Sequence, residues 1–184
     1  MTVVSLVGYT NAGKSTLMRT FSGADVLVED RLFATLDPVT RRVRLPSGNM
    51  VLLTDTVGFI QKLPTQLVAA FRATLEEMTE ATLMLHVVDV THPDAVQQAE
   101  TVEATLAELE LAGKPLLTVL NKADLLIEGK GDSLEEVLKA EGAQALLEPW
   151  GADALVISAA KGWGMEEMGR RLEASLAEAA SAGV

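Results

Sequence analysis

The chain has 184 residues, of which 48% are hydrophobic, and it contains no cysteine. This length and composition suffice for one domain with a substantial core, and they exclude disulfides and thiolate metal sites. A formal net charge of −11 disfavours nonspecific attraction to nucleic acid, because an acidic surface repels phosphate backbones. The sequence carries no recognisable secretory signal and no apolar stretch of membrane-spanning length, so we expect a single cytoplasmic domain over residues 1–184.

A phosphate loop occupies residues 8–16, whose sequence GYTNAGKST fits the pattern GxxxxGK[ST]. An apolar run over residues 3–7 predicts a buried strand before it, and helical spacing of apolar residues follows it. The glycines allow backbone N–H groups to converge on phosphate oxygens at a helix N-terminus. We expect Lys14 to bind the β- and γ-phosphates and Ser15 to ligate Mg²⁺. The residues predicted to hold the phosphates are Asn11, Ala12, Gly13, Lys14, Ser15 and Thr16.

Residues 24–38 show neither helical nor strand periodicity, which predicts a long loop. The residues that follow predict a β-hairpin formed by residues 39–45 and 50–55. The second hairpin strand ends in Asp55, which opens the sequence DTVG. This places a carboxylate at a strand tip, with Gly58 three residues later. The N–H of that glycine is expected to approach a γ-phosphate closely.

A basic patch for a nucleic-acid partner has one candidate, the arginines of the first hairpin strand. Arg41, Arg42 and Arg44 are interleaved with apolar residues there. We interpret them as a solvated face of an edge strand, because charged side chains are a common protection of sheet edges. No autonomous nucleic-acid binding is therefore expected.

The remaining elements alternate between helices and strands. The patterns predict helices around residues 67–78, 93–112 and from 133, strands at 82–89, 116–120 and 154–157, and a final helix that frays from residue 179. Such alternation with one hairpin indicates an α/β fold of the P-loop nucleoside triphosphatase type. We expect a mainly parallel six-stranded sheet with one antiparallel edge strand and helices on both faces. The motifs at its carboxyl ends should meet in one crevice.

The sequence NKAD at residues 121–124 determines which base is expected. Asp124 can accept hydrogen bonds from N1–H and the 2-amino group of guanine, and adenine offers neither donor. Asn121 can hold the base edge or tie this loop to the phosphate loop, and the stem of Lys122 can cover the ring. Backbone N–H groups for the guanine carbonyl oxygen are expected from Ser158, Ala159 and Ala160.

These motifs together resemble the translation-factor-like class of P-loop GTPases, and more narrowly the HflX family. The narrower resemblance rests on GYTNAGKST at residues 8–16, DRLFATLDP at 30–38, DTVGFI at 55–60 and LPTQLVAAFRATLEE at 63–77. It implies a GTPase that acts on the large ribosomal subunit, on stalled or hibernating ribosomes. Family members carry an N-terminal domain that contacts the ribosome; we expect this chain to be an isolated guanine-nucleotide-binding domain without it.

The resemblance also assigns roles at the γ-phosphate. It makes Thr35 the switch threonine that ligates Mg²⁺; Thr40 is the alternative, within a predicted strand. Asp55 would hold Mg²⁺ through water, so the predicted metal-binding residues are Ser15, Thr35 and Asp55. The N–H of Gly58 would sense the γ-phosphate. The residues assigned to catalysis are Lys14, Thr35, Gly58 and Asn11.

Phe59 follows the DxxG glycine, where many GTPases have a glutamine that orients the attacking water. A phenylalanine cannot form that hydrogen bond, so we expect slow intrinsic hydrolysis that a partner accelerates. Gln61 is the weaker candidate for this task. Asn11 resembles the asparagine of potassium-activated GTPases and is expected either to help hold K⁺ or to shape the loop. The alternative function is a guanine-nucleotide-binding regulatory or assembly module with negligible turnover.

Overall fold

The computed structural model of the chain describes residues 1–22, 39–55, 78–126, 132–152 and 154–183. The loop predicted over residues 24–38 and almost all of the helix predicted around residues 67–78 lie outside these ranges. Within the described ranges the chain forms one six-stranded sheet in the order β2-β3-β1-β4-β5-β6. The strands are β1 Val3–Gly8, β2 Val39–Arg44, β3 Met50–Asp55, β4 Leu83–Asp89, β5 Leu116–Asn121 and β6 Leu155–Val156.

The sheet is parallel except at one edge. β2 pairs antiparallel with β3, and every other neighbouring pair is parallel. Both the hairpin and the single antiparallel edge strand are therefore confirmed. Because β1, β3, β4 and β5 run in the same direction, their carboxyl ends lie at the same edge of the sheet, where open α/β sheets bind ligands.

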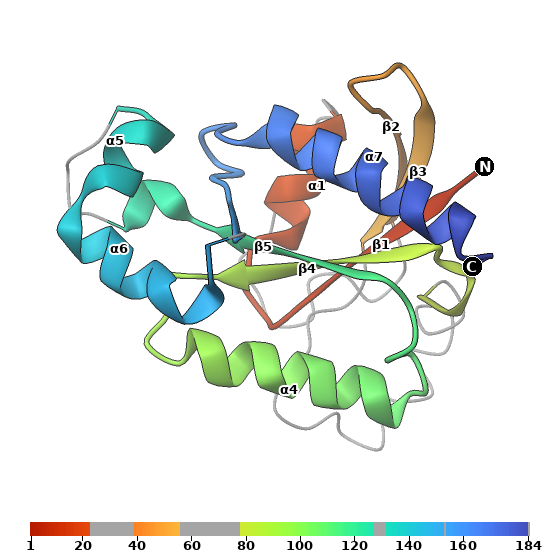
Figure 1. Cartoon of the computed structure of the whole chain (residues 1–184), viewed down its shortest axis with the longest axis horizontal. Coiled ribbons are helices and arrows are strands. Elements are labelled where there is room, and N and C mark those ends of the chain that lie inside the picture. The colour runs from red at the N-terminus through yellow and green to blue at the C-terminus, as the bar shows by residue number, and fades with distance from the viewer. Residues whose placement is uncertain (23–38, 56–77, 127–131, 153, 184) are drawn as a thin grey trace.

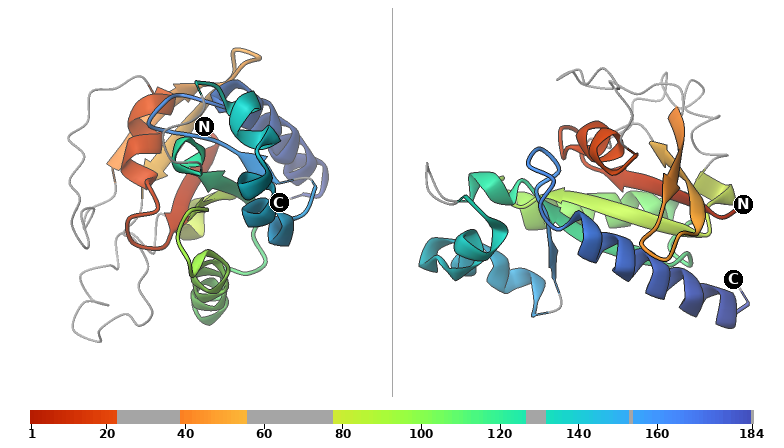
Figure 2. Two further views of the ribbon diagram at one scale, coloured as in Figure 1. Left: turned by 90° about the vertical axis from the view of Figure 1, so that its left-hand side faces the viewer. Right: turned by 90° about the horizontal axis from the view of Figure 1, so that it is seen from above.

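Helices cover both faces of the sheet (Figures 1 and 2). The helices are α1 Lys14–Ser22, α4 Ala95–Glu108, α5 Leu134–Lys139, α6 Glu141–Leu147 and α7 Met165–Ser181, with short 3₁₀ turns η1 Ala123–Leu125 and η2 Glu148–Trp150. α1 and α7 share one core cluster with the sheet, and α4 closes clusters on the opposite face. Strand residues such as Leu6, Leu53 and Leu85 are fully buried between these layers. Each such side chain contributes about 1.5–3 kcal/mol, so the core holds the strand tips in fixed positions.

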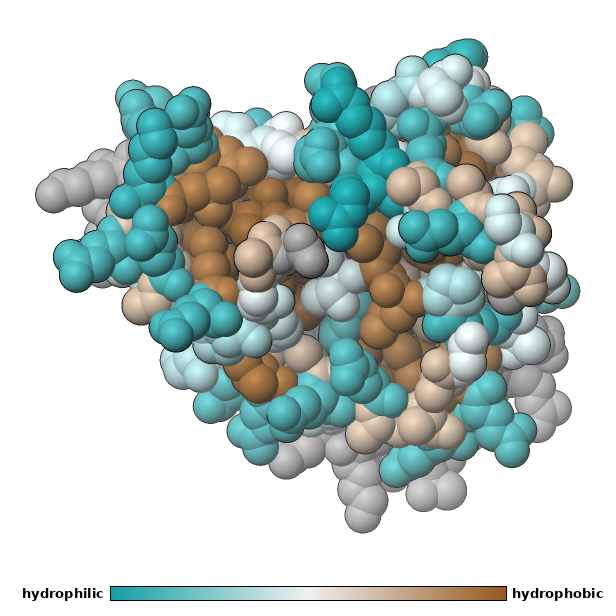
Figure 3. Space-filling model, in the orientation of Figure 1, coloured by the Kyte–Doolittle hydropathy of each residue, from teal (hydrophilic) through white to brown (hydrophobic). Residues whose placement is uncertain are grey.

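The surface of the described residues is mixed, with apolar side chains visible between polar ones (Figure 3). Arg41, Arg42 and Arg44 are exposed on β2, which is the edge strand that the sequence predicts. None of the helices in the described ranges is long and apolar enough to cross a membrane.

Helix α4 is shorter than predicted. It ends at Glu108 because Glu110 adopts a left-handed backbone with φ of 60°, and the N–H of Leu111 then donates to the carbonyl of Leu106 at 2.8 Å. This is a Schellman-type end with glutamate in the usual glycine position. Ala95 is buried on the inner face of the helix, and Val96 is 44% exposed.

The end of the final helix also differs from the prediction. α7 continues to Ser181, and Ala179 is buried at 4% exposure. The predicted fraying from Ala179 is therefore wrong, because this side chain packs inside rather than projecting into solvent.

His86 in β4 is the buried ionisable group of the core. Its side chain is 1% exposed, and its Nδ1 has no hydrogen-bond partner within the described part of the chain. Burial lowers the pKa of His86 to about 4 from the ordinary 6.5. The folded protein therefore keeps this imidazole neutral at pH values where the unfolded chain protonates it.

This burial predicts a pH-dependent stability. Lowering the pH from about 6.5 towards 4 should destabilise the fold by about 3 kcal/mol through His86, because only the unfolded state gains the proton. Above pH 6.5 the contribution is fully present. Denaturant unfolding of His86→Leu should lose correspondingly less stability over this interval than the wild type. The matched control is His92→Gln, at the exposed second histidine, which should retain the wild-type pH slope; an unchanged slope in His86→Leu would contradict the account.

Candidate functional site

The phosphate loop joins β1 to α1 in a tight turn. The N–H of Ala12 donates to the carbonyl of Tyr9 at 3.1 Å, and the carbonyl of Gly13 accepts the N–H of Leu17 at 2.9 Å as helix α1 begins. Asn11 and Gly13 have φ values of 65° and 100°, both in the left-handed region. This backbone turns the loop around the N-terminus of α1, where the helix dipole and free N–H groups favour an anion.

Lys14, Ser15 and Asp55 meet at the ends of β3 and α1. Lys14 Nζ lies 3.4 Å from Asp55 Oδ1, and the Ser15 hydroxyl donates to Asp55 Oδ2 at 3.0 Å. Burial lowers the pKa of Lys14, and the adjacent Asp55 carboxylate offsets part of this effect. The structure thus brings the predicted phosphate lysine and two predicted metal ligands into contact across 40 residues of sequence.

The donor set at this point fits Mg²⁺, which prefers carboxylate and hydroxyl oxygens and keeps several waters. Ser15 and Asp55 supply one oxygen type each, and no cluster of three or more histidine, aspartate or glutamate side chains suited to a metal occurs among the described residues. Thr35 lies outside those residues, and so does Gly58. Thr40, the alternative switch threonine, lies within β2. Its hydroxyl forms a hydrogen bond with the Thr54 hydroxyl of the neighbouring strand at 3.2 Å.

Asn121 ties three loops together. Its Nδ2 donates to the carbonyl of Ala12 at 3.0 Å, and its Oδ1 accepts the N–H of Ala159 at 3.0 Å. The side chain is 2% exposed. Of the two roles open from sequence, the structure shows the tie to the phosphate loop, and the same amide also holds the loop that follows β6.

Asp124 is oriented by Ser158. The Ser158 hydroxyl donates to Asp124 Oδ1 at 2.7 Å and accepts the N–H of Lys161 at 3.1 Å. Asp124 Oδ2 has no hydrogen-bond partner within the residues that the structure describes, so half of the carboxylate stays available. The N–H of Ala159 is engaged by Asn121, whereas Ala160 is exposed beside it.

Two site residues escaped the sequence analysis. The Thr20 hydroxyl of α1 donates to the carbonyl of Ala159 at 2.7 Å, and Asp89 at the end of β4 lies 3.1 Å from Lys122 Nζ. Asp89 ends a buried strand in the same way as Asp55, and this position was a usable signal. Thr20 gave none, because its partner lies 139 residues away.

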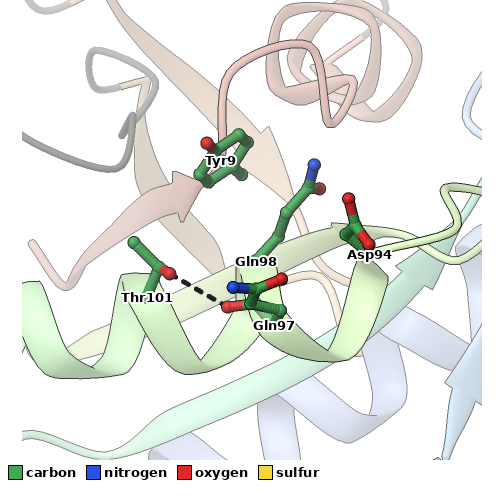
Figure 4. A pocket seen from close by; sticks show the side chains of 5 residues that line it. All are labelled: Tyr9, Asp94, Gln97, Gln98 and Thr101. Atoms are coloured by element: carbon green, nitrogen blue, oxygen red, sulfur yellow. Dashed lines mark hydrogen bonds between the residues drawn. The ribbon is translucent and has the colours of Figure 1, made fainter.

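A separate small cavity of about 110 Å³ lies beside the phosphate loop, between Tyr9 and α4 (Figure 4). Its lining is polar, and the Thr101 hydroxyl there donates to the carbonyl of Gln97 at 3.0 Å. The other lining residues are Asp94 and Gln98. Neither Lys14, Ser15 nor Asp124 contributes to it, so this cavity is not the expected nucleotide site.

The family model described as "50S ribosome-binding GTPase" matches residues 3–122 of the chain. The chain belongs to the 50S ribosome-binding GTPase family. The match spans the phosphate loop and ends within the NKAD sequence, so it includes Asn121 and its partner Ala12.

Several curated relatives of this chain are named GTPase HflX. That of Alkalihalophilus pseudofirmus is 61% identical over 121 residues, covering 66% of this chain and 29% of the relative. That of Magnetococcus marinus is 50% identical over 165 residues, covering 90% and 35%, and that of Escherichia coli K12 is 50% identical over 123 residues, covering 67% and 29%. The resemblance to the HflX family is confirmed over this region. The chain spans about a third of the length of these relatives.

Solved GTP-binding proteins share the fold. A GTP-binding protein from Sulfolobus solfataricus in complex with GDP superposes with a TM-score of 0.66 at 25% identity, covering 96% of this chain and 53% of that chain. Era from Aquifex aeolicus, bound to GDP and AlF₄⁻, gives a TM-score of 0.69 at 22% identity, covering 94% and 56%. The P-loop α/β fold predicted for this GTPase family member is therefore confirmed.

Gly13 provides a test of the tie between the loops. A Cβ at this position would lie 2.3 Å from Asn121 Nδ2, so Gly13→Ala must displace the amide that holds Ala12. We expect the affinity for fluorescent GDP to fall at least about a hundredfold, measured by titration. Gly48→Ala is the matched control, because Gly48 has a similar φ of 95° with nothing within 4 Å. It should lose about 1–2 kcal/mol of stability from backbone strain and keep its affinity; equal affinities for both variants would contradict this role of Asn121.

Proposed function

We propose that this chain is a guanine-nucleotide-binding domain that hydrolyses GTP. The observation that carries the proposal is the pair of hydrogen bonds from Asn121, which joins the phosphate loop at Ala12 to the loop at Ala159. A phosphate-binding loop and a base-reading loop are thereby held at one crevice. A nucleoside triphosphate carries both groups that these loops would bind, a phosphate chain and a base.

Asp124 supports guanine as the base. Its Oδ1 is held by the Ser158 hydroxyl at 2.7 Å, so the carboxylate is oriented before a ligand arrives. Guanine donates from N1–H and the 2-amino group, and adenine would leave this charge without donors. In the proposal the stem of Lys122 covers the base, and the N–H of Ala160, an exposed residue, donates to the guanine carbonyl oxygen.

The γ-phosphate end is served by Lys14, Ser15 and Asp55. Buried Lys14 has a lowered pKa, and an arriving polyphosphate would favour its charged form by replacing lost solvation with negative charge. Ser15 and Asp55 would hold Mg²⁺, which neutralises phosphate charge when bound. Thr35 and Gly58 complete this end in the proposal as the switch residues that release on hydrolysis. Asn11 acts in the proposal by helping to hold a K⁺ ion or by shaping the phosphate loop.

The ribosome is the proposed site of action. The family model that matches the chain is described as 50S ribosome-binding, which supports the large subunit. We infer that the domain acts in the cytoplasm as one guanine-nucleotide-binding unit, on the large subunit of stalled or hibernating ribosomes. Phe59 cannot orient a water molecule, which supports slow hydrolysis until a ribosomal partner orders the site.

K⁺ is a second proposed cofactor. Asn11 has an exposed side chain in the phosphate loop, and its left-handed backbone is fixed by the contact of its carbonyl with Lys122 at 2.8 Å. A monovalent cation beside the phosphates would supply positive charge in place of an arginine finger. The loop-shaping role of Asn11 is the alternative.

Single-turnover hydrolysis of radiolabelled GTP tests the proposal. The chain alone should hydrolyse slowly, and added large ribosomal subunits should accelerate the reaction at least about tenfold; small subunits are the control. Hydrolysis should be faster in KCl than in NaCl at equal ionic strength, and equal rates would rule out K⁺ as a cofactor. If tight GTP binding is found with no hydrolysis under any of these conditions, the chain is a binding module rather than an enzyme.

A further inference from the structure

Lys122 has an unfavourable backbone for a side chain of its type. Its φ is 70°, in the left-handed region, at the start of η1. Glycine and asparagine tolerate this conformation, whereas lysine is strained in it. Such strain persists only where surrounding contacts enforce it, and the ammonium group of Lys122 supplies contacts of that kind.

The Lys122 ammonium joins two loops. It donates to the carbonyl of Asn11 at 2.8 Å and lies 3.1 Å from Asp89 Oδ2. Asn11 is itself left-handed, with φ of 65°. Two left-handed residues from separate loops are therefore connected by one hydrogen bond, and the charge of the donor is balanced by Asp89.

The Asp89 carboxylate is fixed by its own loop. Asp89 ends β4 directly beside Asn121 in the sheet register. Its Oδ1 accepts the N–H of Thr91 at 3.0 Å and the Thr91 hydroxyl at 2.6 Å, which directs Oδ2 to Lys122. The Asp89 side chain is 15% exposed and that of Lys122 is 30% exposed. A partly buried, doubly anchored carboxylate is screened less by solvent than a surface ion pair.

We propose that Asp89 is a positioning residue that slows nucleotide release by holding Lys122 against the phosphate loop. The role rests on the proposed function and adds a residue outside the nucleotide-binding motifs. Asp89 acts through Lys122, because its oxygens are already engaged by Thr91 and the ammonium. The lysine is thus ordered before the nucleotide binds, and this preorganisation reduces the entropy lost on binding.

Stopped-flow release of fluorescent GDP and GTP tests the role with Asp89→Asn, which keeps the size and removes the charge. Both nucleotides should leave about tenfold faster, while the preference for GTP over ATP stays unchanged. The matched control is Asp94→Asn, because Asp94 is exposed at the start of α4 and its side chain forms no cap bond. It should release both nucleotides at the wild-type rate.

A double-mutant cycle separates positioning from a general loss of stability. Lys122→Met should accelerate release, and Asp89→Asn should add nothing in that background. Thr91→Val is a milder change and should accelerate release about threefold. If Asp89→Asn does not fold, Thr91→Val tests the role in its place. Additive acceleration in the cycle, or wild-type release from Asp89→Asn, would overturn the positioning role while leaving nucleotide binding intact. A wild-type chain that binds neither GDP nor GTP would overturn the proposed function itself.

Discussion

The site depends on two hydrogen bonds formed by the side-chain amide of Asn121. A single buried side chain donates to Ala12 in the phosphate loop and accepts from Ala159 after β6. An amide carries one donor end and one acceptor end, so a carboxylate or an aliphatic residue cannot replace both bonds. Gly13 is required by the same contact, because any side chain there would collide with the amide. The residue type at one position therefore constrains another more than a hundred residues away.

Around this contact the sheet supplies rigidity and the loops supply chemistry. β1, β3, β4 and β5 end at one edge with fully buried leucines behind them, so the strand tips resist displacement. Ser158 orients Asp124, and the Thr20 hydroxyl holds the carbonyl of Ala159. Each of these bonds joins segments distant in sequence. The surroundings of Asp124 are thus organised by the protein's own contacts, as electrostatic preorganisation requires.

The phosphate end is organised through charge. Lys14 is buried against Asp55, and burial lowers its pKa. Burial disfavours the charged form of Lys14, so the charge balance here depends on what lies beside its ammonium group. In the proposed function, phosphates and Mg²⁺ complete this charge balance. Binding energy is then available to order the switch residues, which is how a γ-phosphate controls such a domain.

Local patterns predicted most of the fold. Alternating strands and helices, the hairpin and the strand tips that carry Asp55 and Asn121 follow from periodicity and turn chemistry, and the sheet confirms them. The boundaries of α4 and α7 did not follow, because a left-handed Glu110 ends one helix and the burial of Ala179 extends the other. Asp89 and Thr20 were missed for a related reason: their roles depend on tertiary contacts rather than on any spacing in the sequence.

The central claim is that one ligand is held at both ends, by the phosphate loop and by Asp124. Equilibrium titration of the wild type and of Asp124→Ala with GTP and with ATP tests it most directly. The wild type should prefer GTP by at least about a hundredfold, and Asp124→Ala should lose most of that preference while remaining folded. ATP bound as tightly as GTP, or a preference that survives the loss of the carboxylate, would contradict the account.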